Sequence, residues 1–425
     1  MPPTLPTTPS PTRPLSIGYV MRSFPVLFQA TVFNEIRFLQ RAGHRVEIFS
    51  LLDVREEERR LDGIDDLPAA TYCWRDRQTR AQVLGATARI LRGVGIERMR
   101  GAYAFAKEAA LLTDLRAFLR LAAWADILRS RGVRHFHAHW ATEATTLAMI
   151  FSWLSGLRFS FTAHAYDIFF QPQFLDRKLK EAAFAVTVSA YNKRFLQDPY
   201  GEALESKIHV IYPLIDLSVF PERAPSAAPP DGSVAIVSVG RLTEYKGFIH
   251  LVEACRLLKA RHVPFTCRIA GLGEDEAPLR DLIARHGLSG EVQLLGALPF
   301  ARIPSLLEQA TVFCLPCVIA PNGDRDGMPL VLIEAMARGL PVVSSDVIGL
   351  GELVRDGAGL TVPPGDPAAL AEALERVGAL GRNERIEMGR RGRAIIESEF
   401  DARQAARRLA DLFATSLDNG PMERH

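Results

Sequence analysis

Short apolar runs alternate with amphipathic stretches along most of this chain, beginning at Leu15. The run LSIGYV (15–20) is typical of a buried strand, whereas ATVFNEIRFLQRAG (30–43) has the apolar spacing of a helix and ends at a glycine, Gly43. Residues 80–131 are expected to be helical. Further strands are expected at 44–52, 133–140, 158–165, 183–190 and 207–215.

The alternation is cleaner in the second half. Strands are expected at 234–240, 265–271, 291–296, 311–316, 340–345 and 358–362, with helices that include 249–262, 277–287 and 329–338. Apolar strands that alternate with helices predict a parallel sheet covered on both faces. Ligands bind such sheets beyond the carboxyl ends of the strands.

These patterns predict an α/β protein with two Rossmann-like, doubly wound domains that face each other across a cleft. The domains are expected at 15–219 and 234–400, joined by the Pro-, Ala- and Ser-rich linker 220–233. Residues 1–14 are expected to form a disordered tail, and 401–418 a helix that packs back toward the first domain. The length of 425 residues also favours two cores over one.

Composition narrows the class of protein. A net charge of +2 gives no reason to expect nucleic acid as a partner. The five cysteines are scattered and odd in number, which favours a reducing compartment over a disulfide framework. Cys314 and Cys317 form a CxxC without a second ligand pair, so we expect neither a zinc site nor a redox site there.

The amino-terminal residues have no apolar core segment, so they do not predict a secretory signal. The longest uncharged apolar stretch, 144–157, is too short to span a bilayer. We therefore expect a cytoplasmic protein. Residues 75–134 carry 13 Arg and Lys against five Asp and Glu, which fits either solvated helix faces or a basic surface resting peripherally on anionic lipid.

One acid stands in an apolar helix. Glu334 lies in PLVLIEAMARG, where Pro329 suits the start of a helix and Gly339 the residue after its end. Because its helical neighbours are apolar, the carboxylate is expected to be at least half buried, which is costly without partners. Asp326 lies in the loop that leads into this helix. Acids at such positions suit hydroxyl partners, as on a ribose or a sugar.

Two cations follow the strand expected at 234–240. Arg241 and Lys246, in VGRLTEYKGF, precede a helix and form a candidate anion site, although a pair of surface cations is an equal alternative. Gly271 and Gly273 in GLGEDE lack the third glycine of a dinucleotide motif. They are expected to allow a tight turn near a ligand.

Histidines gather beyond strands of the first half. His164 and Asp167 follow one strand, in SFTAHAYDIF, and His135, His137 and His139 alternate along another. Without an acid or cysteine nearby in sequence, a metal site is a weak interpretation, and we predict no metal. Structural roles are favoured for the alternating histidines, with His139 possible at the cleft.

The motifs together resemble the retaining, nucleotide-sugar-dependent glycosyltransferases of family 4, which have the GT-B fold. GRLTEYKG resembles the diphosphate-binding turn of that family, and DGMPLVLIEAMARGLPVV its acidic pair. GLGELVRDGAGLTVPPGDPAALAEAL resembles its closing segment. In the first half, HAHWATEATTLAMI, FTAHAYDIF and VTVSAYNKRFL resemble the branch that builds bacterial exopolysaccharides.

The resemblance implies roles for these residues. Arg241 and Lys246 would neutralise the diphosphate leaving group, Glu334 would bind the ribose, and Asp326 would contact the donor sugar. His164 would lie near the donor sugar and the acceptor oxygen. The full donor site implied comprises Gly240, Arg241, Lys246, Gly271, Gly273, Asp326, Gly327, Met328, Pro329, Leu330 and Glu334. No cofactor or metal is implied.

The acceptor would be a glycan or a lipid-linked glycan, with Gln29, His139 and Asp167 on its side of the cleft. Two positions depart from the family. Asp326 stands where the family usually has Glu, and Gln29 stands where it has an acid or glycine. A GT-B sugar-nucleotide epimerase and a non-catalytic scaffold that binds a nucleotide sugar are the alternatives to a transferase.

Overall fold

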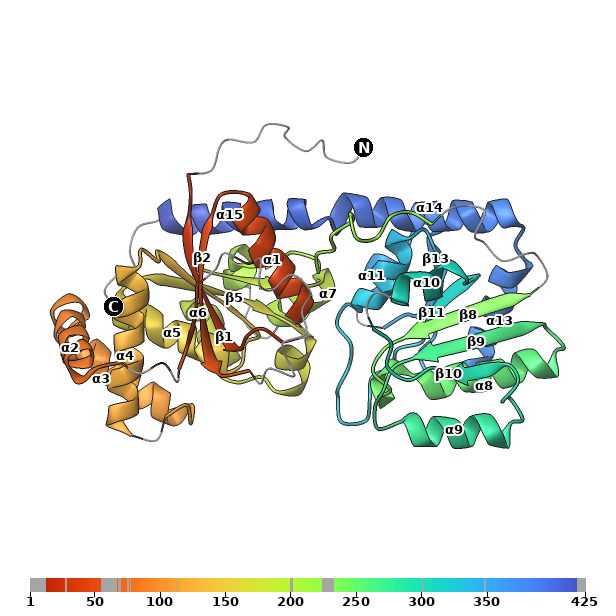
Figure 1. The fold of residues 1–425 in the computed structure, drawn as a ribbon, viewed down its shortest axis with the longest axis horizontal. Coiled ribbons are helices and arrows are strands. Elements are labelled where there is room, and N and C mark those ends of the chain that lie inside the picture. Colours follow the sequence, from red (N-terminus) through yellow and green to blue (C-terminus); the bar gives the residue numbers. More distant parts are fainter. Residues whose placement is uncertain are drawn as a thin grey trace.

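The chain folds into two α/β lobes, each built on one parallel sheet (Figure 1). The structure is a computed structural model that describes residues 13–26, 29–54, 67, 70–74, 76, 78–112, 114–198, 202–223, 233–299, 302–347 and 349–418. The predicted fold, with two Rossmann-like domains, is confirmed. Most of the proposed tail and linker lies outside the described residues.

The amino-terminal lobe has a seven-stranded sheet in the order β3-β2-β1-β4-β5-β6-β7. Its strands are β1 (Ser16–Ser23), β2 (Arg45–Leu52), β3 (Ala70–Cys73), β4 (His135–His139), β5 (Arg158–Ala163), β6 (Phe184–Thr187) and β7 (Ile208–Val210). Its helices are α1 (Ala30–Arg41), α2 (Arg80–Val94), α3 (Ile96–Glu108), α4 (Leu115–Ser130), α5 (Glu143–Ser155), α6 (Leu175–Glu181) and α7 (Ala190–Gln197). Helix α5 is buried along its whole length, which explains its almost entirely uncharged sequence.

The carboxy-terminal lobe has a six-stranded sheet in the order β10-β9-β8-β11-β12-β13. Its strands are β8 (Val234–Val239), β9 (Phe265–Ala270), β10 (Val292–Leu294), β11 (Val312–Leu315), β12 (Val342–Ser345) and β13 (Gly359–Val362). Its helices are α8 (Phe248–Ala260), α9 (Glu276–Arg285), α10 (Ile303–Glu308), α11 (Leu330–Ala337), α12 (Leu350–Leu353), α13 (Pro367–Ala379) and α14 (Arg382–Glu399).

The last helix, α15 (Ala402–Asp418), leaves the second lobe and lies on the first (Figure 1). Its apolar residues, among them Leu409 and Phe413, join the same buried cluster as Ile17 of β1 and Ile36 of α1. The ring of Phe413 lies 5.2 Å from that of His135 and 5.7 Å from that of Phe184. The amino-terminal core is therefore completed by the end of the chain.

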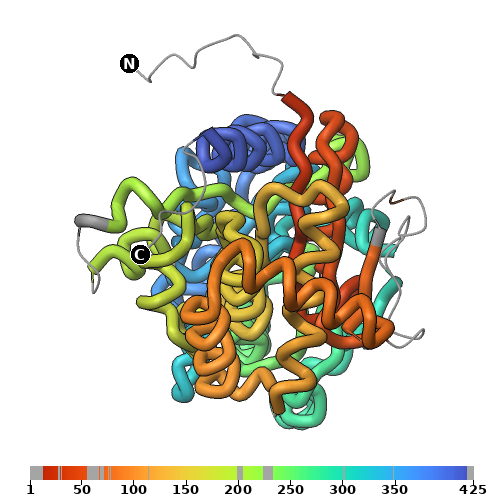
Figure 2. Tube along the Cα trace, turned by 90° about the vertical axis from the view of Figure 1, so that its left-hand side faces the viewer, coloured from red at the N-terminus to blue at the C-terminus, as the bar shows by residue number. Residues whose placement is uncertain are grey.

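Helices α2, α3 and α4 form the end of the molecule farthest from the second lobe, and Figure 2 looks onto this end. Several arginines of the basic region are used within the protein: Arg89 is paired with Asp126, and Arg120 lies over the Trp74 ring. Within the described residues, no helix is both long enough and apolar enough to cross a membrane.

Candidate active site

A cleft of about 610 Å³ separates the two lobes. It is lined by residues that follow the carboxyl ends of strands in both sheets: His164 after β5, Tyr212 after β7, Arg241 after β8 and Asp326 beyond β11. In each sheet the strands run parallel, so their carboxyl ends meet at one edge, and the two edges face each other here.

The two predicted cations lie around one tyrosine. The Arg241 guanidinium donates to the Tyr245 hydroxyl at 2.7 Å, and the Arg241 and Lys246 charges lie 5.7 and 5.8 Å from the centre of the Tyr245 ring. Lys246 ends a 3₁₀ turn, Glu244–Lys246, that runs directly into α8. The short spacing in sequence therefore brings both cations beside the Tyr245 ring, and Arg241 and Tyr245 line the cleft.

Lys246 is already paired. Its ammonium forms a salt bridge with the Asp326 carboxylate, and both side chains are largely buried, 11% and 18% exposed. Burial alone would lower the pKa of Lys246, but the charge of Asp326 and their hydrogen bond raise it above its ordinary value. Two residues predicted to contact different parts of a donor thus contact each other in the ligand-free protein.

Glu334 has no such partner. It lies in α11, half-buried, and within the described part of the chain its carboxylate accepts no hydrogen bond and forms no ion pair. Burial raises its pKa from 4.5 to about 7. The helix begins at Leu330, with Pro329 as its N-cap, one residue later than the sequence pattern suggests. The sequence-based expectation of a costly, half-buried carboxylate agrees with this geometry.

The glycines bring backbones close together. A Cβ on Gly271 would lie 1.8 Å from the carbonyl oxygen of Gly240, and one on Gly273 would lie 2.1 Å from that of Leu242. Gly240, Arg241 and Gly271 also line a smaller cavity of about 200 Å³. Gly327 lies against the first lobe. A Cβ on Gly327 would lie 3.1 Å from the Cβ of Ala165, the residue after His164.

Of the other predicted donor residues, Met328 and Leu330 line the cleft with Gly327. Lys246, Gly273, Pro329 and Glu334 line neither cavity themselves.

The histidines of the first lobe form a buried chain of polar contacts. His164 Nε2 lies 3.3 Å from His139 Nδ1, and His139 Nε2 lies 2.9 Å from a carboxylate oxygen of Glu35. The Tyr19 hydroxyl donates to the same oxygen at 2.6 Å. His164 and His139 both line the cleft, and burial lowers the pKa of His164 to about 3.

Glu35 was not singled out by the sequence analysis. It is only 6% exposed and lines the cleft from α1. The signal was available: Glu35 is spaced three residues from Val32 and four from Leu39, so it lies on the apolar face of its helix. The same reasoning that drew attention to Glu334 applies here.

Glu35 also approaches His137, which the sequence pattern could not show. The ligand atoms of Glu35, His137 and His139 lie within 4.8 Å of one another. However, His137 Nδ1 and Nε2 lie 2.8 and 3.1 Å from the hydroxyls of Ser160 and Thr162. A metal ion would have to displace these hydrogen bonds and those of His139.

Two residues predicted for the acceptor side are turned away from the cleft. The Asp167 carboxylate is fully buried and accepts from the backbone amides of Ala141 and His164, so it holds the loop that carries His164. Gln29 is also buried, and its side chain bonds to the backbone of Ser23 and Val26. Thr31, Val32 and Glu35 line the cleft from α1 instead.

Comparison with known proteins gives the family. The model described as Glycosyltransferase Family 4 matches residues 29–219, and the model described as Glycosyl transferases group 1 matches residues 220–395. The chain belongs to the family 4 glycosyltransferases. The boundary between the two matches falls in the segment that joins the lobes.

Two relatives of this chain are named for the biosynthesis of colanic acid and of amylovoran. It is 40% identical over 199 residues to the putative colanic acid biosynthesis glycosyltransferase WcaL of Escherichia coli K12, over 47% of this chain and 48% of that one. It is 42% identical over 178 residues to the amylovoran biosynthesis glycosyltransferase AmsK of Erwinia amylovora, over 42% and 44%. The chain thus spans about half the length of these relatives.

Solved structures share the fold. A glycosyltransferase from Rickettsia africae superposes with a TM-score of 0.70 at 18% identity, over 96% of this chain and 100% of that one. Anabaena HepE, solved in complex with UDP, also superposes with a TM-score of 0.70 at 18% identity, over 94% and 100%. These likenesses confirm the GT-B architecture.

Proposed function

We propose that this protein transfers a sugar from a nucleoside-diphosphate sugar to a hydroxyl group of a glycan or lipid-linked acceptor in the synthesis of an exopolysaccharide. The cleft supports this proposal best, because Arg241 and Asp326 line it from the second lobe, Lys246 pairs with Asp326, and polar side chains of the first lobe line its other wall.

The cations suit the leaving group. Breaking the bond between a sugar and a diphosphate develops negative charge on the phosphate oxygens, and fixed positive charges nearby stabilise that transition state. Arg241 can offer two parallel donors, and Lys246 a point charge. When a donor binds, its phosphates compete with Asp326 for Lys246, which leaves Asp326 free to accept from a sugar hydroxyl.

Glu334 suits the nucleoside. A ribose has two neighbouring hydroxyls, and an ionised carboxylate offers only acceptors. The carboxylate is half-buried and has no partner among the residues that the structure describes, so hydrogen bonds from a ribose would compensate for its lost hydration. Gly271 and Gly273 let the loop after β9 pack directly on the backbone of Gly240 and Leu242, because a Cβ at either glycine would overlap a carbonyl oxygen.

The amino-terminal lobe would bind the acceptor, with His164 and His139 at the cleft. We infer a front-face reaction that retains the anomeric configuration, in which the leaving phosphate helps to take the proton of the acceptor. The cationic pair would stabilise the leaving group without a metal ion.

A uridine nucleotide is the first donor to test, since Anabaena HepE was solved with UDP. A cytoplasmic site of action, with peripheral contact to an anionic inner membrane face, completes the proposal.

The first test is thermal shift of the purified protein with UDP, GDP and ADP and their common sugars, with and without EDTA. A ligand that binds only the folded protein raises the melting temperature. A shift with one base that EDTA does not alter supports the donor site. No shift with any of them contradicts the proposal.

The second test measures turnover with that donor and a candidate acceptor. Arg241→Ala or Lys246→Ala is expected to lower kcat about 100-fold or more, as the loss of one fixed transition-state contact does elsewhere. Arg280→Ala, on the exposed face of α9, is the matched control and should leave kcat unchanged. Tight binding without release of nucleoside diphosphate would instead indicate a scaffold, and product altered only in the donor sugar would indicate an epimerase.

A further inference from the structure

Four side chains connect the cleft to the interior of the first lobe without interruption. They are Tyr19 of β1, Glu35 of α1, His139 at the end of β4, and His164 after β5, and the three contacts between them measure 2.6, 2.9 and 3.3 Å. Tyr19, Glu35 and His139 are 0%, 6% and 2% exposed. Nothing in the proposed chemistry of the donor site requires the first three, so their arrangement needs its own explanation.

The direction of the hydrogen bonds can be worked out from the inner end. Burial, followed by the charge of Glu35, raises the pKa of Tyr19 well above its ordinary value, so its hydroxyl keeps its proton and donates. One oxygen of Glu35 therefore accepts from Tyr19 and has a lone pair left for His139. His139 Nε2 must carry a proton to donate to it.

The outer end follows from the inner end. A neutral His139 that carries its proton on Nε2 has a lone pair on Nδ1, which accepts from His164 Nε2. His164 is neutral, since burial lowers its pKa to about 3, so it has only one proton and that proton lies on Nε2. Its Nδ1 is then a lone pair, and within the described residues it has no hydrogen-bond partner.

We propose that Glu35 and His139 are positioning residues that fix the tautomer of His164, so that His164 presents Nδ1 to the cleft as an acceptor for a substrate hydroxyl. This inference rests on the proposed function, which supplies a substrate with hydroxyl groups. The Trp140 ring, 4.9 Å from the ring of His164, holds the imidazole in place from the side. A carboxylate that orients one imidazole through another extends the way in which acids fix single histidines.

Other rings lie beside these hydrogen-bonded side chains. His137 lies beside His139, with ring centres 5.2 Å apart, and Tyr19 lies within 5.3 and 6.0 Å of the two rings. A second proton on His139 would turn its Nδ1 into a donor and would move the proton of His164 to Nδ1. The protonation state of one atom, Nδ1 of His164, therefore distinguishes the two arrangements, and it can be observed directly.

The test is ¹⁵N NMR of histidine-labelled, ligand-free protein, with His164 assigned from the signals missing in His164→Gln. We expect Nδ1 of His164 to show the shift of an unprotonated nitrogen and Nε2 that of a protonated one. In Glu35→Leu, His139 loses its acceptor, and the protonated fraction of His164 Nδ1 should rise. Glu35→Gln keeps an acceptor oxygen and should resemble the wild type, as should Tyr19→Phe, which leaves the Glu35–His139 contact intact.

Turnover provides an independent readout. Glu35→Leu is expected to lower kcat/KM about tenfold or more, the effect of losing one hydrogen bond to a buried polar group, while Glu35→Gln retains most of it. In a His164→Gln background, Glu35→Leu should have no further effect, because Glu35 acts through His164. Melting curves of each variant check that it is folded.

Four outcomes would overturn the inference. Three are a protonated Nδ1 in the wild type, a tautomer unchanged in Glu35→Leu, and losses that add in the double variant. The fourth is a shift of the His137 and His139 signals on adding Zn²⁺ to EDTA-treated protein, which would show a metal site. Because the NMR needs no substrate, a confirmed tautomer together with no nucleotide binding would reject the proposed function alone.

Discussion

Lys246 and Asp326 neutralise each other in the ligand-free protein, although each is expected to contact a donor. Their salt bridge is largely buried, so separating them without replacement would leave two poorly hydrated charges. Under the proposed function, a bound diphosphate would supply the replacement for Asp326. The salt bridge therefore stabilises both charged side chains before a donor binds.

Asp326→Asn is expected to lower the free energy of unfolding of the ligand-free protein by about 1–3 kcal/mol, because it leaves the Lys246 ammonium buried without its counter-charge. The same variant should show a larger rise in melting temperature on adding nucleoside diphosphate than the wild type does. Thermal shift and urea unfolding measure both quantities. Asp326→Glu, which keeps the charge, is the control, and equal ligand-induced shifts in all three proteins would contradict the role given to the pair.

Glu334 should make stability depend on pH. Its pKa is raised by burial from 4.5 to about 7, so in the unfolded chain it ionises at lower pH than in the folded protein. The folded state is favoured below the unfolded pKa, and this advantage is lost as the pH rises through about 7.

Glu334→Gln is therefore expected to raise the free energy of unfolding by on the order of 2 kcal/mol at about pH 8, with little difference at about pH 4.5. It should also weaken binding of nucleoside diphosphate. Urea unfolding at both pH values checks the first result, and Glu387→Gln on the exposed face of α14 is the control. If the affinity for nucleoside diphosphate matches that of the wild type, Glu334 is only a structural residue.

The residues of the candidate site differ in how far the sequence could predict them. Arg241 and Lys246 follow β8 closely and Asp326 lies in the loop that leads into α11, so local pattern is enough to predict them at one edge of the sheet. Asp167 and Gln29 have similar positions, yet their side chains satisfy backbone groups instead. The direction of a side chain in a loop depends on which buried amides need a partner, and this is a property of the folded chain.

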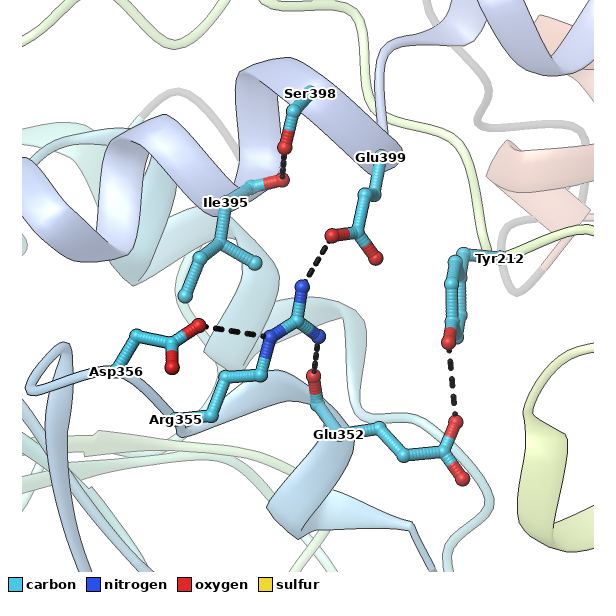
Figure 3. A network of polar contacts seen from close by, with 7 residues as sticks. All are labelled: Tyr212, Glu352, Arg355, Asp356, Ile395, Ser398 and Glu399. Atoms are coloured by element: carbon cyan, nitrogen blue, oxygen red, sulfur yellow. Dashed lines mark hydrogen bonds and ion pairs between the residues drawn. The ribbon is translucent and has the colours of Figure 1, made fainter. Parts of the chain in front are cut away.

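At the scale of elements, a short helix of one lobe is held by an acid of the other. Glu352 of α12 accepts hydrogen bonds from the backbone amides of Ala190 and Tyr191, at 2.8 and 2.7 Å, at the start of α7. Its carboxylate also accepts from the Tyr212 hydroxyl at 3.2 Å (Figure 3). Burial, followed by the charge of Glu352, raises the pKa of Tyr212 to about 12. An acid at a helix amino terminus is favourably placed for unpaired amides.

The same network continues through Arg355. Its guanidinium donates to the backbone carbonyl of Glu352 and pairs with Glu399 at the end of α14 (Figure 3). Tyr212 stacks on Phe400, with ring centres 4.7 Å apart. The network therefore connects the contacts between the lobes to Glu399 and Phe400, where the chain returns to the first lobe.

Glu352→Ala is expected to lower the free energy of unfolding by about 1–3 kcal/mol, because it leaves amides of α7 without an acceptor. Hydrogen exchange at Ala190 and Tyr191 should become faster, while exchange in α13 stays the same. Glu352→Gln retains one acceptor oxygen and should have a smaller effect. Unchanged exchange at α7 would show that the contact does not hold the lobes together.

The elements themselves were largely predictable, with exceptions at the edges. The predicted run 207–215 forms only the three-residue strand β7, and the edge strand β3 was not predicted. Edge strands are short and have one neighbour, so their sequences carry little of the apolar signal that marks a central strand such as β4. The long central elements, buried on both sides, were the ones that the pattern predicted well.

At the scale of the molecule, the far end of the first lobe combines apolar and basic side chains. Leu84 and Leu91, spaced to lie on one face of α2, are 68% and 36% exposed, and Ile96 at the start of α3 is 50% exposed. Arg80, Arg92 and Arg100 are exposed on the same two helices. Such a surface is suited to the headgroup region of an anionic membrane.

Replacing Leu84 and Leu91 together with Asp is expected to weaken binding to vesicles that contain phosphatidylglycerol about tenfold or more, because two apolar side chains are lost from the contact. Co-sedimentation with vesicles measures this. Ile249→Asp, at a partly exposed position on α8 of the other lobe, is the control and should bind as the wild type does. Equal binding to vesicles of phosphatidylcholine alone would exclude an electrostatic contribution.

The return of α15 to the first lobe matters to anyone who wishes to recombine such enzymes. Exchanging halves at one junction near residue 220 would separate the first lobe from the apolar face that Leu409 and Phe413 supply. The chimera would pack a foreign helix against that core. A working hybrid therefore needs two junctions, one before β8 and one between α14 and α15. Each hydrophobic core then keeps all of its own sequence.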